Sequence, residues 1–330
     1  MGHRRWIGGA SGDATVADLR PSHRRRSAGG EFPLGCGVLP RRTRRPASVR
    51  PMSSATYPLP PDADLDTLIA TWESAHDDLL ELLDSLDDEQ WNAPTDLPGW
   101  SVADVVAHIT WLELWLMGEA EPVHEPDWST LPHAVSDKAK FMEIPVDRRR
   151  SWSREEVMAE TRETLQRRLA SLRSDFTDRN DAYEGPFGPG NIGGLVQQRT
   201  FDTWVHEQDI RRAVGKPGSL DTPGARASAT QIAPGLGKIV GKGAGAGVGE
   251  SVRFTIIEPG VVFDIAVVVG EDGRARMVES IDAPTVTLTM PFESFMLATG
   301  GRAPDWRSTV TVDGDADLAD RVLSNMTLTP

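Results

Sequence analysis

The most constraining feature of this chain is a change in its hydrophobic pattern near residue 220. Between residues 62 and 215, apolar residues recur at helical spacing, as in Leu65, Leu68 and Trp72. From residue 221 onward the pattern becomes short β-branched runs bounded by Gly, Pro and Asp. The sequence therefore predicts an α plus α+β protein, with a helical part at 62–215 and a small α+β C-terminal part at 221–330.

The helical part predicts a four-helix bundle, because four amphipathic segments are separated by breaker residues. The predicted helices span 62–86, 101–117, 153–172 and 193–214. Ser101 and Ser153 are followed three residues later by Asp104 and Glu156, which is the spacing of a capping box. A long loop rich in Pro and acids is predicted at 118–133, and no helix is predicted between 117 and 153.

The C-terminal part predicts a mostly antiparallel sheet with short helices between its strands. The predicted strands are 251–258, 261–270, 284–290 and 308–314, and the predicted helices are 291–300 and 315–326. Residues 225–247 predict a helix followed by a flexible Gly/Ala segment.

The first 61 residues differ from the rest and predict a disordered basic leader. Residues 1–51 hold eleven Arg and three acids, are rich in Gly, Ser and Pro, and contain no helical period. They also lack the apolar segment of a secretory signal. Two interpretations stay open: a basic arm, or a start codon assigned too early, with Met52 as the first residue.

Charge and cysteine content limit the partners of the remaining chain. Residues 52–330 keep 24 of the 35 Lys and Arg residues and 46 of the 49 acids, a formal charge of −22. Such an acidic body argues against a nucleic-acid partner. The single cysteine, Cys36, lies in the leader, so thiol chemistry would need a thiol from outside. No apolar run reaches the length of about 18 residues that a membrane-spanning helix needs.

The predicted helix 193–214 carries polar residues in the middle of its apolar face. With about 100° per residue and Asp202 at zero, His206 falls at about +40° and Asp209 at about −20°. Leu195 falls within the same arc, whereas Glu207 falls on the far side. A solvated face would be separate from the apolar one. We therefore expect Asp202, His206 and Asp209 to point into the bundle and Glu207 to face outward.

Buried acids and imidazoles are costly unless they are paired or bind a metal. Asp202 and His206, four residues apart, can converge on one point. His108 lies in an apolar stripe of the predicted helix 101–117 and offers a third ligand. Two imidazoles and a carboxylate suit Zn²⁺ with an open position, and also admit Fe, Ni or Co. The alternatives are an Asp–His–Asp hydrogen-bond network and a His108 that is an ordinary core residue.

Three segments of the chain resemble a known family. The stretch 97–113 (LPGWSVADVVAHITWLE) resembles the second-helix motif of the mycothiol-dependent maleylpyruvate isomerase family, a branch of the DinB-like metal-binding bundles. The stretch 199–215 (RTFDTWVHEQDIRRAVG) resembles its fourth-helix motif. The stretch 286–323 resembles its sterol-carrier-like second domain. The resemblance covers residues 62–330 and implies a DinB-like four-helix bundle followed by a sterol-carrier-like domain.

The resemblance also implies a metal site and a chemistry. It places metal ligands at His108, Asp202 and His206, with Asp202 standing where the family isomerase has Glu. It places a catalytic arginine in the C-terminal part, for which Arg302 is the candidate; the alternative is a surface-loop arginine. It implies mycothiol as thiol cofactor or co-substrate. The thiolate would add to the cis double bond of maleylpyruvate and leave after rotation, or would stay attached to an electrophile.

The sequence thus leads to the expectation of a cytoplasmic, metal-dependent enzyme. It would act as a maleylpyruvate-type cis–trans isomerase or as a mycothiol S-transferase, on a small-molecule electrophile and a low-molecular-weight thiol. The alternative is a non-catalytic metal- or small-molecule-binding protein. We expect no nucleic-acid or membrane partner, and the substrate and oligomeric state stay open.

Overall fold

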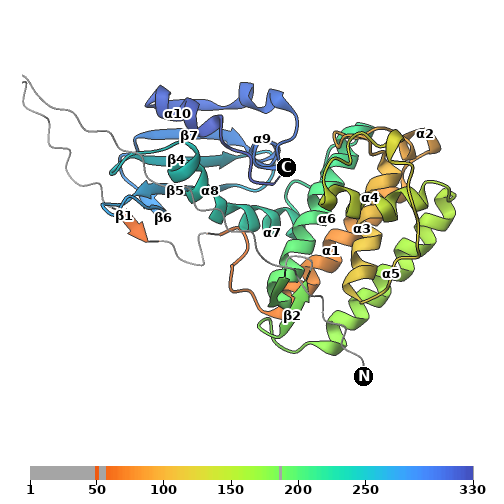
Figure 1. Cartoon of the computed structure of the whole chain (residues 1–330). Coiled ribbons are helices and arrows are strands. Elements are labelled where there is room, and N and C mark those ends of the chain that lie inside the picture. Colours follow the sequence, from red (N-terminus) through yellow and green to blue (C-terminus); the bar gives the residue numbers. More distant parts are fainter. Residues whose placement is uncertain (1–48, 52–56, 186–187, 330) are drawn as a thin grey trace, which may run out of the picture. The chain divides into compact units, whose positions relative to one another are not determined.

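A computed structural model describes residues 49–51, 57–185 and 188–329 (Figure 1). All of them fall within one compact unit, Arg45–Pro330. The predicted leader therefore lies mostly outside the described residues. Two of its segments are nevertheless ordered: Val49–Pro51 form strand β1, and the backbone of Leu59 is hydrogen-bonded to the Thr230 hydroxyl. For these residues the expectation of disorder is wrong.

The helical part forms the predicted four-helix bundle (Figure 1). Its long helices are α1 (Leu65–Asp84), α3 (Val102–Leu116), α5 (Arg154–Asp175) and α6 (Ile192–Val214). They contact one another in a ring, α1 with α6, α6 with α3, α3 with α5, and α5 with α1. Leu79, Val105 and Ile210 are among the buried apolar residues at its centre. This arrangement brings α3 and α6, which carry the candidate ligands, into direct contact.

The helix ends follow the predicted signals. Ser101 and Ser153 each accept a hydrogen bond from the backbone of the third helical residue, and the acid there bonds back, which completes both capping boxes. Helix α6 ends at Gly215, whose φ of 66° is a left-handed conformation that favours glycine. These local signals define where α3, α5 and α6 begin or end.

The segments that connect the predicted helices contain elements that we did not expect. Helix α4 (Asp137–Arg149) follows a single turn at Trp128–Thr130, and a short helix α2 (Asp88–Trp91) precedes α3. The hydrophobic pattern hides α4 because it contains Pro145 and because it buries the charged residues Glu143 and Arg149. A hairpin of β2 (Ala182–Gly185) and β3 (Gly188–Asn191) also leads into α6.

The C-terminal part is a mixed sheet with the strand order β1-β6-β5-β4-β7-β8. Its strands are β4 (Ser251–Ile257), β5 (Phe263–Val269), β6 (Ala275–Ile281), β7 (Val286–Pro291) and β8 (Thr311–Gly314). The pair β4–β7 is parallel and the other neighbouring pairs are antiparallel, so the mostly antiparallel sheet is confirmed. Strand β6 lies in a segment where no strand was predicted.

Helices cover one face of this sheet and form its main core. They are α7 (Pro223–Ile232), α9 (Phe292–Gly300) and α10 (Ala316–Leu323), with two irregular turns, Leu236–Lys238 and Ile239–Gly243. Their apolar residues pack against Phe254, Ile265 and Leu288 on the strands. The predicted α+β character of the C-terminal part is thereby confirmed.

Helix α6 also contributes to the core of the C-terminal part. The Trp204 indole is buried in that core, its N–H donates to the Ser219 carbonyl at 2.9 Å, and its ring lies 5.6 Å from that of Phe292. Helix α6 contacts α7 as well. The helix that carries two candidate ligands is therefore fixed against the part that carries Arg302.

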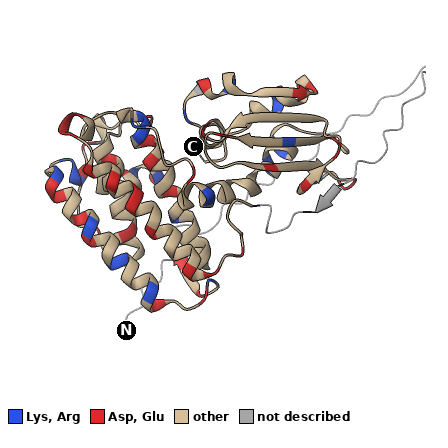
Figure 2. Cartoon of the chain, turned by 180° about the vertical axis from the view of Figure 1, so that it is seen from behind, with Lys and Arg blue, Asp and Glu red and all other residues tan. Residues whose placement is uncertain are grey.

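Charge is distributed unevenly between the two parts. Figure 2 shows acidic and basic residues interspersed along the helices, whereas the strands carry few of either. Across the described residues, no helix combines the length and the apolar character needed to cross a membrane.

His76 is an inner residue of α1, and only 2% of it is exposed. Its Nδ1 lies 2.8 Å from the Trp72 carbonyl and its Nε2 lies 3.1 Å from the Thr203 hydroxyl. The carbonyl can only accept, so Nδ1 carries the proton and Nε2 accepts from Thr203. Burial lowers the pKa of His76 to about 4. The neutral imidazole is thus fully hydrogen-bonded inside the bundle.

This burial predicts an acid-sensitive fold. The unfolded chain binds a proton at His76 below its ordinary pKa of 6.5, whereas the folded chain does so only near 4. The free energy of unfolding should therefore fall as the pH drops from about 6.5 to 4, by about 3 kcal/mol from this residue. In His76→Gln this part of the fall should be absent. Urea unfolding at several pH values measures it, and equal slopes in both proteins would contradict the assignment.

Candidate metal centre

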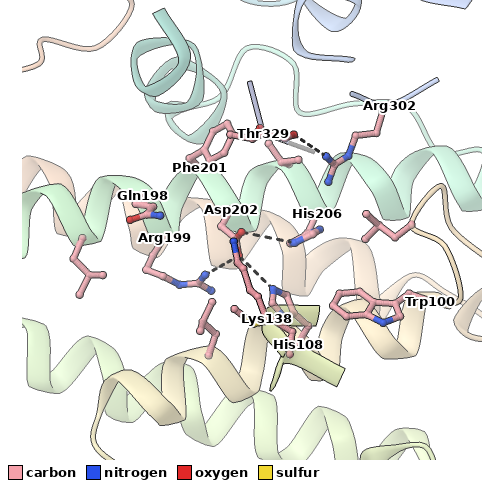
Figure 3. A pocket seen from close by; sticks show the side chains of 15 residues that line it. Trp100, His108, Lys138, Gln198, Arg199, Phe201, Asp202, His206, Arg302 and Thr329 are labelled. Carbon is pink, nitrogen blue, oxygen red and sulfur yellow. Dashed lines mark hydrogen bonds and ion pairs between the residues drawn. The ribbon is translucent and has the colours of Figure 1, made fainter. Parts of the chain in front are cut away.

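The structure brings the three predicted ligands together at one point. His108 comes from α3, and Asp202 and His206 come from α6; one ligand atom of each lies within 4.8 Å of the others. His108 Nε2 lies 3.8 Å from Asp202 Oδ2, and His206 Nε2 lies 3.8 Å from Asp202 Oδ1 (Figure 3). The inward direction expected from the helical wheel is therefore confirmed for Asp202 and His206.

The spacing and chemistry of these atoms fit a small divalent ion. Two ligands of a tetrahedral ion with bonds of about 2.1 Å lie about 3.4 Å apart. The observed separations of 3.8 Å, which run to the two different oxygens of Asp202, are slightly longer than this value, and all three ligand atoms lie within 4.8 Å of one another. Two imidazole nitrogens and one carboxylate oxygen are ligands that Zn²⁺ accepts, and they leave one tetrahedral position open. The three residues can thus hold a metal.

His206 is oriented by a buried carboxylate. Its Nδ1 lies 3.0 Å from Asp209 Oδ2, and Asp209 is fully buried. Burial alone would raise the pKa of Asp209, but the hydrogen bond from His206 and the charge of Arg302 hold it below its ordinary range. The carboxylate is ionised and can only accept, so His206 Nδ1 donates and Nε2 keeps its free electron pair. Asp209 thus orients the His206 ring.

His108 is kept neutral by its surroundings. Burial lowers its pKa to about 3, and the charges of His206 and Arg199 act in the same direction, while Asp202 opposes them. A neutral imidazole is the form that binds metals. Among the described residues, His108 Nδ1 is buried without a hydrogen-bond partner. The two histidines of the site are therefore supported in different ways.

A buried chain of charges supports Asp202 and was missed by the sequence analysis. Arg199 donates to Asp202 Oδ2 at 2.6 Å and to Glu113 Oε1 at 2.8 Å, and Arg168 lies 3.2 Å from Glu113 Oε2. Burial would raise the pKa of Asp202, but Arg199 and the two histidines hold it below its usual range. The carboxylate is thus ionised. On the helical wheel Arg199 falls at about +60°, inside the polar arc, so its position could have been noticed.

The three ligands line one side of a cavity of about 280 Å³. Its wall is largely apolar, with Leu97, Trp100, Leu112, Met142, Leu195, Phe201 and Val205. Its polar lining, besides the ligands, consists of Lys138, Gln198, Arg199, Arg302 and Thr329 (Figure 3). A small molecule in this cavity would meet the open side of the candidate metal site and several cationic groups.

Arg302 belongs to this cavity rather than to an exposed loop. Its side chain is 10% exposed, and its Nε and Nη2 each lie 3.3 Å from an oxygen of Asp209. Its Nη1 donates to the Gly300 carbonyl at 2.6 Å. Asp209 therefore connects Arg302, from the C-terminal part, to His206 in the bundle.

Other expected positions turned out differently. Glu207 was expected on an outward face, but it is fully buried and accepts from Arg211 at 2.7 Å. The expectation is wrong because α6 contacts α1 and α7 on that side. Two histidines for which no site role was expected, His124 and His133, pair with Asp147 and Glu143 at 2.7 and 3.0 Å, and they are not among the residues that line the cavity.

The fold and the site thus define a helical-bundle protein with a candidate metal centre and an appended α+β part. Residues 72–211 match the family described as the mycothiol maleylpyruvate isomerase N-terminal domain. The match thus covers most of the helical part of this chain. The match ends before the C-terminal part, so it does not cover the resemblance to a sterol-carrier-like domain.

The chain is also similar to two uncharacterized proteins of Mycobacterium tuberculosis. With each it shares 26% identity over 154 residues, which cover 46% of this chain and 58% of the relative. The matched segment thus spans little more than half of the relatives' length.

Among solved structures, the chain is similar to crystal structures of the mycothiol-dependent maleylpyruvate isomerase and of a single-residue variant of it. The identity is 14% in both cases, with TM-scores of 0.46 and 0.47. The alignments cover 76% of this chain and 94% of the other. A similarity this distant carries no information on activity.

The buried charges around Glu113 lead to a prediction about stability. Glu113→Ala would leave the guanidinium groups of Arg199 and Arg168 buried without their carboxylate. We expect the free energy of unfolding to fall by about 3–5 kcal/mol. As a control, Asp84→Asn removes an exposed ion pair with Arg162 and should cost less than about 1 kcal/mol. Denaturant unfolding measures both, and equal losses would argue against a supporting role for Glu113.

Proposed function

We propose that this chain is a metal-dependent enzyme that uses mycothiol as thiol cofactor or co-substrate. The observation that carries the proposal is the set His108, Asp202 and His206, which converges at the wall of a cavity in a domain of the mycothiol maleylpyruvate isomerase family. Isomerisation of a maleylpyruvate-type substrate and transfer of the thiol to an electrophile are the two reactions proposed.

The three residues would hold a divalent ion, for which Zn²⁺ suits the donor set best. A bound ion of this kind lowers the pKa of a thiol at its open position, so that the thiolate forms near neutral pH. The chain's part is to keep the His108 imidazole neutral, to keep Asp202 ionised through Arg199, and to orient His206 through Asp209. The apolar wall of the cavity would exclude water from a bound substrate.

We assign Arg302 a catalytic role in this proposal. It lines the cavity, keeps a fixed position through Asp209 and Gly300, and belongs to a different part of the chain from the ligands. A fixed guanidinium can bind an anionic group of the substrate or stabilise negative charge that develops during the reaction. Lys138 and Arg199 also line the cavity, and Arg199 is paired with Asp202 and Glu113.

The second candidate is a non-catalytic metal- or small-molecule-binding protein. The observation that favours it is the 2.6 Å ion pair between Arg199 and Asp202. This pair reduces the negative charge that the Asp202 carboxylate can offer to a metal. A cytoplasmic location and the lack of a nucleic-acid partner stay predictions from the sequence.

The metal site predicts that one substitution removes metal and activity together. In His206→Ala one imidazole ligand is lost, so the purified protein should hold little metal by elemental analysis and show no mycothiol-dependent turnover. The matched control is His124→Ala, which removes an imidazole that pairs with Asp147 outside the cavity. The control should keep metal and activity, and full metal retention in His206→Ala would refute the ligand assignment.

The same proteins distinguish the candidate reactions. Wild-type protein is assayed with several electrophiles, with and without mycothiol, while free thiol is measured. Thiol consumption supports a transferase, product formation with constant thiol supports an isomerase, and bound metal without either supports the binding protein.

Arg302→Ala should retain metal but lose activity. Asp209 keeps Arg212 and His206 as partners, so the metal content should remain near that of the wild type. The value of kcat/KM should fall by about 100-fold, because a fixed cationic group at the substrate is lost. Arg307→Ala, which removes an arginine paired with Asp320 away from the cavity, serves as control. An unchanged kcat/KM in Arg302→Ala would exclude the catalytic role.

A further inference from the structure

The two histidines of the candidate metal centre are held in unlike ways. His206 has its ring fixed by the hydrogen bond from Nδ1 to Asp209. His108 is buried, yet among the described residues its Nδ1 finds no such partner. Histidine ligands are normally oriented by a hydrogen bond on the nitrogen that does not face the metal. The ring of His108 must therefore be oriented by packing.

Besides the His206 imidazole, whose ring centroid lies 5.2 Å away, the aromatic ring that packs against His108 is the indole of Trp100. Its ring centroid lies 5.0 Å from that of His108, at an interplanar angle of 44°. Trp100 precedes the N-cap of α3, and its side chain returns over the helix to reach His108 two turns later. Both residues line the cavity. A shift of this indole would give the imidazole room to rotate away from Asp202.

The indole itself is held by Glu143 of α4. The Trp100 Nε1–H donates to Glu143 Oε2 at 2.7 Å, and the Glu143 side chain is only 1% exposed. Arg150 Nη2 lies 2.7 Å from the other carboxylate oxygen, and His133 Nε2 lies 3.0 Å from Oε2. A buried carboxylate with these partners cannot move without leaving several polar groups unsatisfied.

The backbone of Gly99, next to Trp100, is also in close contact with His133. Gly99 has a φ of +79°, and a Cβ at this position would lie 2.2 Å from Nδ1 of His133. The His133 ring thus lies directly against the turn that precedes Trp100. Glu143 and His133 together hold this turn from the side of α4, and Met142, next to Glu143, lines the cavity.

We propose that Glu143 is a positioning residue of the candidate metal centre, whose carboxylate fixes the Trp100 indole and thereby the ring of His108. The inference rests on the metal site of the proposed function. Helix α4 contributes no ligand, but through Glu143 it would determine the orientation of the ligand His108. Asp209 orients His206 directly, through a hydrogen bond. Among the described residues, no carboxylate is hydrogen-bonded to His108, and Glu143 orients it indirectly, through Trp100.

The test measures Zn²⁺ affinity in the full chain by competition with a chelator. Glu143→Leu removes the acceptor, and Trp100→Phe keeps an aromatic ring but removes the N–H. Each should raise the dissociation constant by about 10-fold, as loss of ligand-orienting partners does. The double variant should be no weaker than either single one, because both break the same link. Glu143→Gln, which keeps an acceptor for the indole, should remain close to the wild type.

The matched control is Glu160→Leu. Glu160 of α5 accepts a hydrogen bond from Arg149 of α4 and so also stabilises the position of α4, but neither residue lines the cavity. If Glu143 only stabilised α4, this control would weaken Zn²⁺ binding as much as Glu143→Leu does. Equal weakening in Glu160→Leu and Glu143→Leu would overturn the proposal. So would additive effects in the double variant, or wild-type affinity in folded Glu143→Leu and Trp100→Phe. Trp100→Phe leaves the ion pairs of Glu143 intact and decides the question if Glu143→Leu does not fold.

A second readout needs no metal. In metal-free protein with ¹⁵N-labelled histidine, the ring signals of His108 should shift in Glu143→Leu and Trp100→Phe, and should not shift in Glu160→Leu. Unshifted signals would overturn the proposal. Wild-type protein that binds Zn²⁺ without turnover would refute the proposed activity alone. Wild-type protein that binds no Zn²⁺ would refute the metal site, and the ring signals would still decide whether Glu143 orients His108.

Discussion

The enclosure of α6 is the constraint on which the rest of the structure depends. This helix contacts α1, α3 and α7, and its Trp204 is buried in the core of the C-terminal part. Three of its charged residues, Arg199, Glu207 and Asp209, are consequently buried and must find partners inside the protein. Arg199 pairs with Glu113, Glu207 with Arg211, and Asp209 with His206 and Arg302. Asp202 and His206 of this helix face a cavity, where they meet His108 of α3.

The ion pairs near the ligands explain how the site tolerates so much buried charge. Asp202 is ionised because Arg199 lies beside it, and Arg199 is tolerated because Glu113 neutralises it. Asp202 is therefore available as an ionised carboxylate between the two imidazoles.

The main elements and the three ligand candidates could be predicted from the sequence because their signals are local. Helical spacing, the capping boxes at Ser101 and Ser153, and the β-branched runs each act over a few residues. Helix α4 was missed because it buries Glu143 and Arg149 rather than an apolar stripe. Glu207 was misplaced because a wheel shows one helix alone and not the neighbours that enclose it. The partners Glu113 and Trp100 depend on contacts between helices, which no single segment encodes.

Asp209 is shared between two groups, and this sharing has a thermodynamic consequence. Its carboxylate accepts from His206 on one side and from Arg302 on the other. An anion that draws Arg302 toward itself leaves more of the negative charge of Asp209 to His206, which makes the imidazole a stronger electron donor. Binding at the two ends of this bridge would therefore be coupled. Because coupling free energies are reciprocal, a metal bound at His206 would change the affinity for an anion at Arg302 by the same factor.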